Sequence, residues 1–181
     1  MLRESAHGLI RAVAVYEPRK HTACMSEHTA LIEWTSTAEP TDFLKGRYSR
    51  EHQWTFDGGF TMPASPSPTV VPLPWSNPAV VDPEEAFVAS VSSCHMLTFL
   101  YLAAKAGFAV RHYRDHAVGV MTKNERGALW VSRVTLNPQI AYAGDKTPSP
   151  PELDQLHHAA HDGCFIANSI RTEVIVAPTP A

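Results

Sequence analysis

Residues 82–107 constrain the fold more than any other stretch of the sequence, because they predict one long helix. Asp82 suits the N-cap, Pro83 the first helical position, and Gly107 the residue after the last turn. Between Ala86 and Ala104 there is no Asp, Glu, Lys or Arg, and bulky apolar side chains point in several directions around the axis. Such a helix needs cover on most sides, so we expect it to lie at the centre of the molecule.

The uncharged run must also be weighed as a membrane span, since its length is close to the roughly 20 residues that a bilayer requires. The middle of the run argues against that interpretation, because it carries a cluster of polar side chains. These are Ser90, Ser92, Ser93, Cys94, His95 and Thr98. No other segment is comparably hydrophobic, so the sequence favours a buried helix in a soluble protein with no membrane partner.

The composition indicates a globular protein with a substantial core. The chain has 181 residues, of which 44% are hydrophobic, and its net charge of -3 gives no reason to expect a nucleic-acid partner. Residues 1–24 include several charged side chains and lack the unbroken apolar run of a secretory signal, which predicts a cytoplasmic protein. We interpret residues 1–24 as a flexible extension and residues 25–181 as a single domain.

The order of the remaining elements predicts an α+β fold. We expect an antiparallel β-meander over residues 30–62 and a second over 108–142, with one strand from 129 to 142 that bends or lies at an edge at Pro138. A second helix over 152–161 and a closing strand over 171–176 follow. Two meanders and two main helices in this order lack the alternation of a parallel βαβ fold.

The chain has three cysteines, Cys24, Cys94 and Cys164. A secreted disulfide framework usually has more cysteines and an even number of them. Taken singly, Cys94 and Cys164 would each more often be an inert buried thiol than a nucleophile. Both lie in mostly apolar helical settings beside residues that could tune them. The pair is therefore more informative than either member.

Charged residues upstream of Cys94 could activate such a thiol. A thiol reacts as the thiolate, so a cysteine in an apolar pocket requires a positive neighbour. Arg50 and Arg47 are the available candidates, and Arg50 shares an expected strand face with several aromatic residues. An arginine placed there needs a carboxylate to hold its guanidinium, which Glu84 or Glu85 could provide. Arginine, glutamate and cysteine would then form one functional unit.

Two motifs around the cysteines resemble those of the OsmC/Ohr family of thiol-dependent peroxidases. They are Asp-Pro-Glu-Glu-Ala-Phe-Val-Ala-Ser-Val-Ser-Ser-Cys-His at 82–95 and Gly-Cys-Phe-Ile-Ala-Asn-Ser at 163–169. The likeness extends over about residues 30–176 and is nearer to the broad OsmC-like branch than to the organic hydroperoxide resistance branch. The sequence departs from the best-known peroxidases of the family in one place, since Phe165 stands where a proline normally follows the second cysteine.

The resemblance implies an antioxidant enzyme of the oxidative stress response that reduces organic hydroperoxides to alcohols. Cys94 would be the peroxidatic cysteine and would pass through a sulfenic acid, and Cys164 would be the resolving cysteine that closes a Cys94–Cys164 disulfide. A dithiol, for which a lipoylated protein is a candidate, would reduce that disulfide. The family glutamate lies ten positions before the reactive cysteine and falls on Glu84. The family arginine is placed on Arg50, with Arg47 as the alternative.

The spacing of Glu84 and Cys94 bears on the oligomeric state. Ten residues of straight helix span roughly 15 Å, so the two side chains cannot touch while both belong to one unbroken helix. Either the helix starts later than Pro83, or Glu84 serves the cysteine of another chain. The resemblance implies an intertwined homodimer with active sites at the subunit interface, which suits the second alternative. We therefore predict an obligate homodimer.

Two other interpretations remain beside the peroxidase. The protein could be an OsmC-like stress protein that binds a small lipophilic ligand and has little peroxidase turnover, or both cysteines could be inert. Neither a cofactor nor a metal ion is expected. His157 and His161 have i and i+4 spacing, but without a nearby Cys-x-x-Cys motif that spacing is a weak indication of a metal site.

Overall fold

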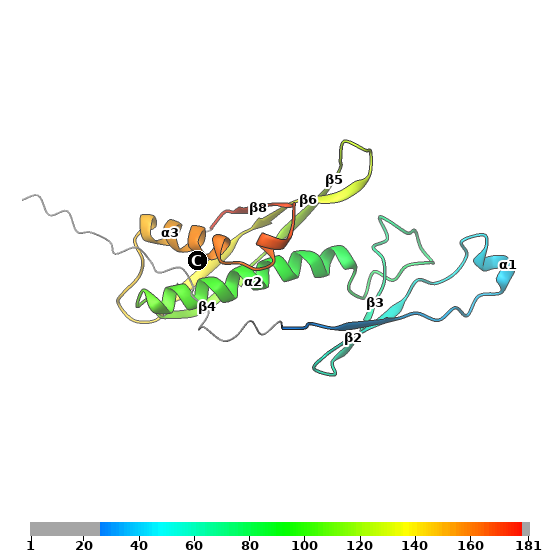
Figure 1. The fold of residues 1–181 in the computed structure, drawn as a ribbon, viewed down its shortest axis with the longest axis horizontal. Coiled ribbons are helices and arrows are strands. Elements are labelled where there is room, and N and C mark those ends of the chain that lie inside the picture. Colours follow the sequence, from blue (N-terminus) through cyan, green and yellow to red (C-terminus); the bar gives the residue numbers. More distant parts are fainter. Residues whose placement is uncertain (1–25, 179–181) are drawn as a thin grey trace, which may run out of the picture.

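The computed structural model of the protein describes residues 26–178. The extension predicted for residues 1–24, with Cys24, lies outside the described residues. The described chain has two parts, an N-terminal arm that contains residues 30–64 and a larger body that contains residues 83–176. Figure 1 shows the arm and the body one after the other along the long axis of the molecule, with the body built on one long helix. Helices and antiparallel strands are both present, and the predicted α+β class is confirmed.

The arm is a three-stranded antiparallel sheet in the order β1-β2-β3. Its strands are β1 (Ala30–Glu33), β2 (His52–Phe56) and β3 (Thr61–Ala64), and a short helix α1 (Pro40–Phe43) lies between the first two. The alternation of aromatic residues predicts a longer β2, which would include Arg50. The strand begins only at His52, because the Arg50 N–H donates to the Trp75 carbonyl at 3.1 Å, outside the sheet, while the Arg50 guanidinium turns back to the carbonyl oxygens of Gly46 and Tyr48, at 3.4 and 3.0 Å.

The long helix predicted from the sequence is α2 (Pro83–Lys105), with 23 residues and no interruption. Its start is fixed by a capping box in which Asp82 accepts from the Glu85 N–H and the Glu85 carboxylate accepts from the Asp82 N–H. Its end is fixed by Gly107, whose φ of 79° suits glycine, and by Lys146, which donates to the Ala106 carbonyl at 2.9 Å. Both predicted ends are confirmed.

Five strands and a second helix complete the body. They are β4 (Val110–Asp115), β5 (Val118–Lys123), β6 (Leu129–Leu136), β7 (Pro138–Tyr142), α3 (Pro150–Asp162) and β8 (Glu173–Val176), with a 3-10 turn η1 (Ala167–Ser169) before the last. β4 pairs with β7, and the other sheet has the order β5-β6-β8. The β6–β8 pair is parallel, with Arg133 opposite Glu173. The second half is therefore not a purely antiparallel meander.

The single strand expected from 129 to 142 divides at Asn137 into β6 and β7, which belong to different sheets. The Asn137 N–H donates to the Asp115 carboxylate at 2.6 Å, and its side-chain amide donates to the His116 carbonyl at 2.9 Å. These bonds take Asn137 out of the strand ladder, and Pro138, which has no N–H to donate, begins the next strand. Pro138 marks a change of sheet rather than a bend within one strand.

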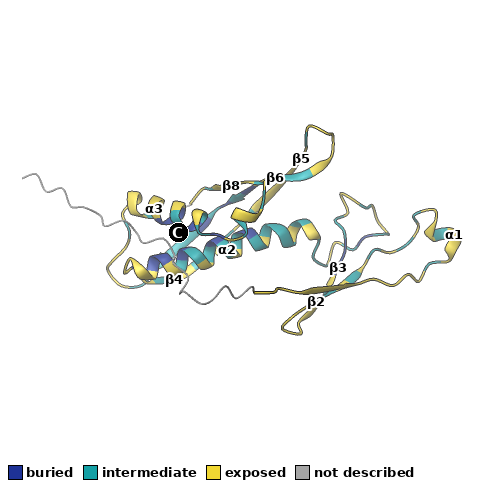
Figure 2. Cartoon of the chain, viewed as in Figure 1, coloured by how far each residue is buried: buried dark blue, intermediate teal, exposed yellow. Residues whose placement is uncertain are grey.

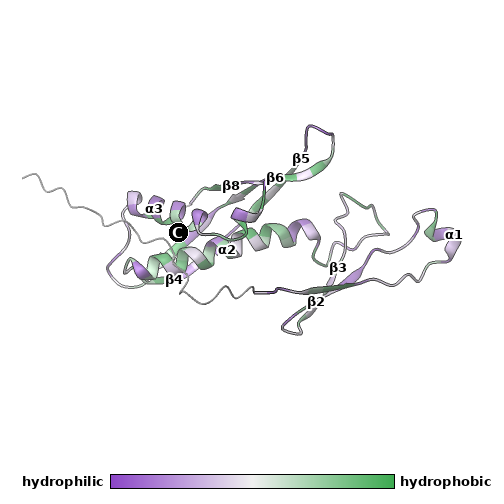
Figure 3. Ribbon diagram, in the orientation of Figure 1, coloured by the Kyte–Doolittle hydropathy of each residue, from purple (hydrophilic) through white to green (hydrophobic). Residues whose placement is uncertain are grey.

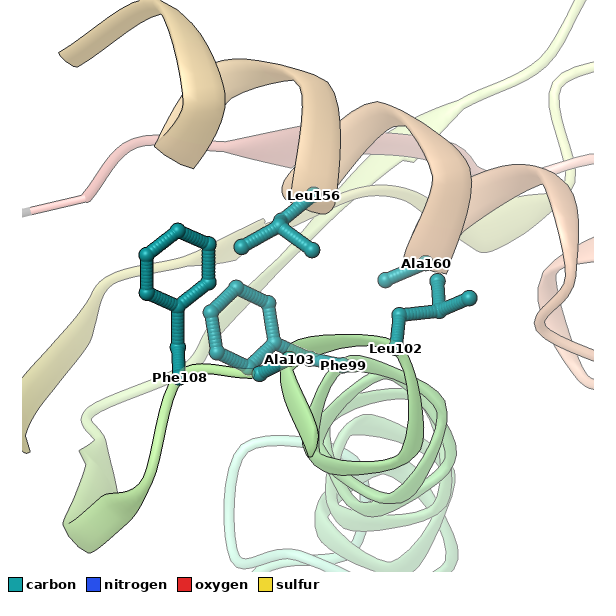
Figure 4. Close-up of a cluster of buried hydrophobic side chains, with 6 residues drawn as sticks. All are labelled: Phe99, Leu102, Ala103, Phe108, Leu156 and Ala160. Carbon is teal, nitrogen blue, oxygen red and sulfur yellow. The ribbon is translucent and has the colours of Figure 1, made fainter. Parts of the chain in front are cut away.

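The core lies on one side of α2. One cluster joins α2 to α3 and consists of Phe99, Leu102, Ala103, Phe108, Leu156 and Ala160 (Figure 4). A second cluster, Val91 with Val134 and Leu136, joins α2 to β6. Figure 2 shows the buried positions gathered where α2 meets these elements. Of the described helices, α2 is long and apolar enough to cross a membrane, by its length and composition alone.

Apolar side chains also remain exposed on both parts of the chain. Figure 3 shows hydrophobic positions along α2 and on the strands of the arm, well beyond the buried clusters. On the arm, Leu31, Ile32 and Phe60 are all more than half exposed, and on α2 Leu97 is 61% exposed. A single chain therefore covers α2 on one side only, although its sequence predicts cover on most sides.

Candidate active site

The structure brings together the two candidate cysteines, which are 70 positions apart in the sequence. Cys94 is half-buried in the middle of α2, and Cys164 is buried in the turn directly after α3. Because α2 packs against α3, the Cys94 side chain lies beside the Cys164 thiol, close enough to raise its pKa. Both are free thiols in this structure.

The local sequence explains how the turn after α3 approaches α2 so closely. Gly163 faces Thr98, and a Cβ atom at Gly163 would lie 3.1 Å from the Thr98 methyl carbon and 3.3 Å from the Ala159 carbonyl oxygen. A larger residue would push the end of α3 away from α2. The Thr98 hydroxyl is held by its own hydrogen bond to the Cys94 carbonyl at 2.9 Å. Gly163 thus permits the contact between the two thiols.

The environments of the two thiols differ. Burial and, to a smaller extent, the neighbouring Cys94 side chain together raise the pKa of the Cys164 thiol to about 11, although the Ala167 N–H, 3.4 Å from its sulfur, acts in the opposite direction. Cys164 is therefore protonated at neutral pH. Cys94 is the more exposed of the two residues.

Glu84 lies in the first turn of α2, whereas Cys94 lies in the middle of this helix. Since α2 begins at Pro83 and is continuous, the suggestion that the helix starts later is wrong, and Glu84 lies about 15 Å along the axis from Cys94. One carboxylate oxygen of Glu84 is buried and has no hydrogen-bond partner among the described residues. An unpaired buried carboxylate oxygen is costly, which marks Glu84 as a group that a cation could satisfy.

The Glu84 side chain lines a groove of about 720 Å³ between α2, β4 and β5. Three further carboxylates line it, those of Asp82, Glu85 and Asp115. Among the described residues that form its walls there is no lysine, arginine or histidine. The groove is thus acidic as well as apolar, and a positively charged group would suit it.

The candidate arginines belong to the arm. The Arg50 guanidinium lies 4.0 Å from the centre of the Tyr48 ring, and Arg47 forms an ion pair with Asp42 at 3.8 Å. Figure 1 shows the segment between α1 and β2 at the far end of the arm, away from the middle of α2. Within one chain, the structure therefore brings Cys94 beside Cys164, but it leaves Glu84 about 15 Å along α2 from Cys94 and places Arg50 on the arm.

Two histidines form a pair near the thiols that was not predicted from the sequence. His95 Nε2 and His157 Nδ1 are 3.1 Å apart, and their rings are stacked with centroids 5.4 Å apart. The apolar stripe of α3, with Leu153, Leu156 and Ala160, places His157 in the core and could have indicated a buried partner. No group of three or more potential ligands in the described part of the chain is arranged to hold a metal ion, and His157 turns toward His95 rather than toward His161.

The two imidazoles are neutral at neutral pH. Burial lowers the pKa of His95 to about 4, and the neighbouring His157 contributes to this. Burial likewise lowers the pKa of His157 to about 4, against an opposing effect of Asp154. Neutral rings can share one hydrogen bond, whereas two imidazolium rings have only donors to present.

Acid is expected to destabilise the protein through these two histidines. Their folded-state pKa values of about 4 lie below the ordinary value of 6.5, so between these pH values the unfolded chain binds more protons than the folded one. The two histidines do not lower the free energy of unfolding above about pH 6.5. As the pH falls toward 4, they lower it by up to about 3 kcal/mol each. Thermal melts from pH 7 to 4.5 measure this effect. A variant with leucine at both positions should show a shallower slope, and an unchanged slope would assign the effect to other groups.

Comparison with known proteins places the chain in a family. A model of the OsmC-like proteins matches residues 77–178, which span α2 to β8 and include both candidate cysteines. The chain is similar to the solved structure of an OsmC-like protein of unknown function from Vibrio cholerae, with 49% identity and a TM-score of 0.81 over 86% of this chain and 100% of that chain. No protein of curated function matches it.

More distant solved structures share the fold. One is an organic hydroperoxide resistance protein from Elizabethkingia anophelis, with 18% identity and a TM-score of 0.62 over 88% of this chain and 99% of that chain. Another is the organic hydroperoxide resistance protein OhrB of Bacillus subtilis, with 19% identity and a TM-score of 0.53 over 84% of this chain and 98% of that chain. The resemblance read from the cysteine motifs is confirmed, and the chain belongs to the OsmC-like family.

Proposed function

We propose that the protein is a thiol-dependent peroxidase that reduces organic hydroperoxides to alcohols in the reducing environment of the cytoplasm. The observation that carries this proposal is the contact between the Cys94 and Cys164 thiols, one half-buried and reachable and the other buried. Fold relatives named as organic hydroperoxide resistance proteins support the same reaction class.

The reaction uses the two sulfurs in turn. The Cys94 thiolate attacks the distal oxygen of the hydroperoxide, the O–O bond breaks, and the alkoxide leaves as the alcohol after it takes up a proton. Cys94 is then a sulfenic acid. The Cys164 sulfur attacks the Cys94 sulfur, and the hydroxyl leaves as water with the proton that Cys164 gives up. A dithiol, such as that of a lipoylated protein, reduces the resulting disulfide by thiol–disulfide exchange.

The surface around Cys94 suits an apolar substrate. Leu97 and Tyr101 follow Cys94 at three and seven positions, so they share its side of α2. Both are exposed, and so is Phe165, which directly follows Cys164. Three large apolar side chains beside a reachable thiol favour a hydroperoxide with an alkyl or aryl group over hydrogen peroxide.

The complete site is proposed to form in a homodimer. Glu84 has an unsatisfied buried carboxylate oxygen in an acidic groove, Arg50 lies on an arm with exposed apolar side chains, and neither reaches the thiols of its own chain. A second copy of the chain could cover these surfaces and bring its Glu84 and Arg50 to Cys94. The arginine, held by the carboxylate, would stabilise the Cys94 thiolate.

Thiol titration tests the proposed reaction. In a Cys24→Ser background, an alkyl hydroperoxide is expected to remove both remaining free thiols, those of Cys94 and Cys164, because the first oxidation leads directly to the disulfide. The further substitution Cys94→Ser should leave the Cys164 thiol unchanged, whereas Cys164→Ser should leave Cys94 as a sulfenic acid that a dimedone probe can trap. Unchanged thiols, together with saturable binding of a lipophilic ligand, would favour the ligand-binding alternative.

A further inference from the structure

The proposed reaction makes no use of the His95–His157 pair, although the pair lies between the two helices that place the thiols. His95 directly follows Cys94 on α2, and His157 is on α3, which ends just before Cys164. The two side chains are 1% and 4% exposed, and the hydrogen bond between them joins residues 62 positions apart. It is therefore a buried polar link between the two elements that carry the sulfurs.

Apolar side chains pack directly around this link, while Asp154 and His161 of α3 are near enough to affect the pKa values of the two rings. Phe99 lies against His157 with ring centroids 4.6 Å apart, and Leu102, Leu156 and Ala160 fill the rest of the contact. Apolar side chains hold two helices together but tolerate small displacements of one along the other. A hydrogen bond weakens steeply when its length or angle changes. The histidine pair thus restricts the offset between α2 and α3 more tightly than the packing around it.

The pair is not an efficient way to stabilise the core. His95 Nδ1 and His157 Nε2 are buried and have no hydrogen-bond partner among the described residues. Two neutral imidazoles carry two N–H groups, and only one can lie in the bond between them. In either arrangement of the protons, one buried N–H is left without an acceptor, which lowers stability. Two apolar side chains would avoid this loss, so a role in geometry accounts for the pair better than a role in stability.

We propose that the His95–His157 hydrogen bond is a positioning device that holds α2 and α3 at the offset at which the Cys94 and Cys164 sulfurs can bond. A disulfide requires Cβ atoms about 3.8 Å apart and a restricted torsion angle, so a displacement of about 1 Å between the helices would slow its closure. The attack of Cys94 on a hydroperoxide involves one sulfur only and does not depend on that offset. The pair therefore acts on the second step of the proposed function, on which this inference rests.

Matched substitutions separate the hydrogen bond from the bulk of the side chain. His157→Leu removes the nitrogen, whereas His157→Asn retains a polar group near the position of Nδ1. On the other helix, His95→Leu and His95→Gln form the equivalent pair, since the glutamine amide lies near the position of Nε2. In a Cys24→Ser background, single-turnover peroxide consumption measures the first step, and the decay of dimedone-reactive Cys94 with loss of free thiol measures disulfide closure.

The leucine variants are expected to close the disulfide at least about tenfold more slowly than the parent, with peroxide consumption changed by less than about twofold. The asparagine and glutamine variants should recover most of the closure rate. A leucine variant that closes at the parent rate, or amide variants that close no faster than leucine, would overturn the proposal. A variant that fails to fold, judged by its circular dichroism, is replaced by its counterpart on the other helix.

Oxidation by diamide tests the positioning role of the histidine pair independently of the proposed peroxidase function. Diamide takes two electrons and two protons from a thiol pair and so closes the Cys94–Cys164 disulfide without any hydroperoxide. If hydroperoxide leaves the parent thiols intact, the proposed function fails, but the diamide closure rates of the leucine and amide variants still test the positioning role. If hydroperoxide oxidises the parent and all four variants close alike with both oxidants, the positioning role alone fails.

Discussion

Replacement of Cys94 by serine is expected to lower kcat/KM for an alkyl hydroperoxide by at least about a thousandfold. The serine hydroxyl is not ionised at neutral pH, and its oxygen cannot take up the peroxide oxygen to give a species equivalent to a sulfenic acid. Cys164 cannot substitute for Cys94, because burial raises its pKa to about 11 and keeps it protonated. Peroxide consumption with dithiothreitol as the reductant measures the effect.

Two further variants serve as controls for this prediction. Cys24→Ser removes a cysteine outside the described residues and should leave turnover unchanged. Cys164→Ser should still consume about one equivalent of peroxide and then stop or slow, since the sulfenic acid forms but the internal disulfide cannot. If Cys94→Ser kept more than about a tenth of the parent rate, the assignment of the peroxidatic sulfur would be wrong.

A mixture of two inactive variants, Cys94→Ser and Glu84→Ala, is expected to regain activity after their subunits exchange. Glu84 lies about 15 Å along α2 from Cys94 of its own chain, so in the proposed dimer it serves the partner's cysteine. In a mixed dimer one site then carries both substitutions, and the other carries neither. Random exchange makes about half of the dimers mixed, which predicts about a quarter of the parent activity.

The matched control mixes Cys94→Ser with Cys164→Ser. These two sulfurs belong to one chain and contact each other there, so each site of the mixed dimer retains one damaged thiol pair and no disulfide-dependent turnover should return. Native mass spectrometry verifies that the subunits have exchanged. Exchange without recovery in the Cys94→Ser and Glu84→Ala mixture would place Glu84 outside the active site of a partner. Replacing Glu84→Ala by Arg50→Ala or Arg47→Ala in the same mixture decides between the two arginines.

The features that the sequence determined are those set by short-range interactions. The start of α2 was predictable because its capping box joins Asp82 to Glu85, three positions away, and its end because Gly107 supplies a backbone conformation that glycine favours. The two cysteine motifs and the family were likewise readable, since a motif is a local pattern. The short β2 and the break at Asn137 were not, because side chains and carbonyls from outside the strand ladder end those strands.

The arrangement of the site was decided by the tertiary structure alone. The packing of α3 on α2 brings Cys164 to Cys94 and His157 to His95, and the second pair joins positions 62 apart. No local pattern encodes such contacts, because they depend on which faces of two helices are buried together. The sequence predicted that α2 needs cover on most sides, and the structure shows that one chain covers only one of them. The exposed apolar face of α2 and the buried Glu84 oxygen that has no partner among the described residues likewise depend on long-range contacts, which the chain's local preferences do not specify.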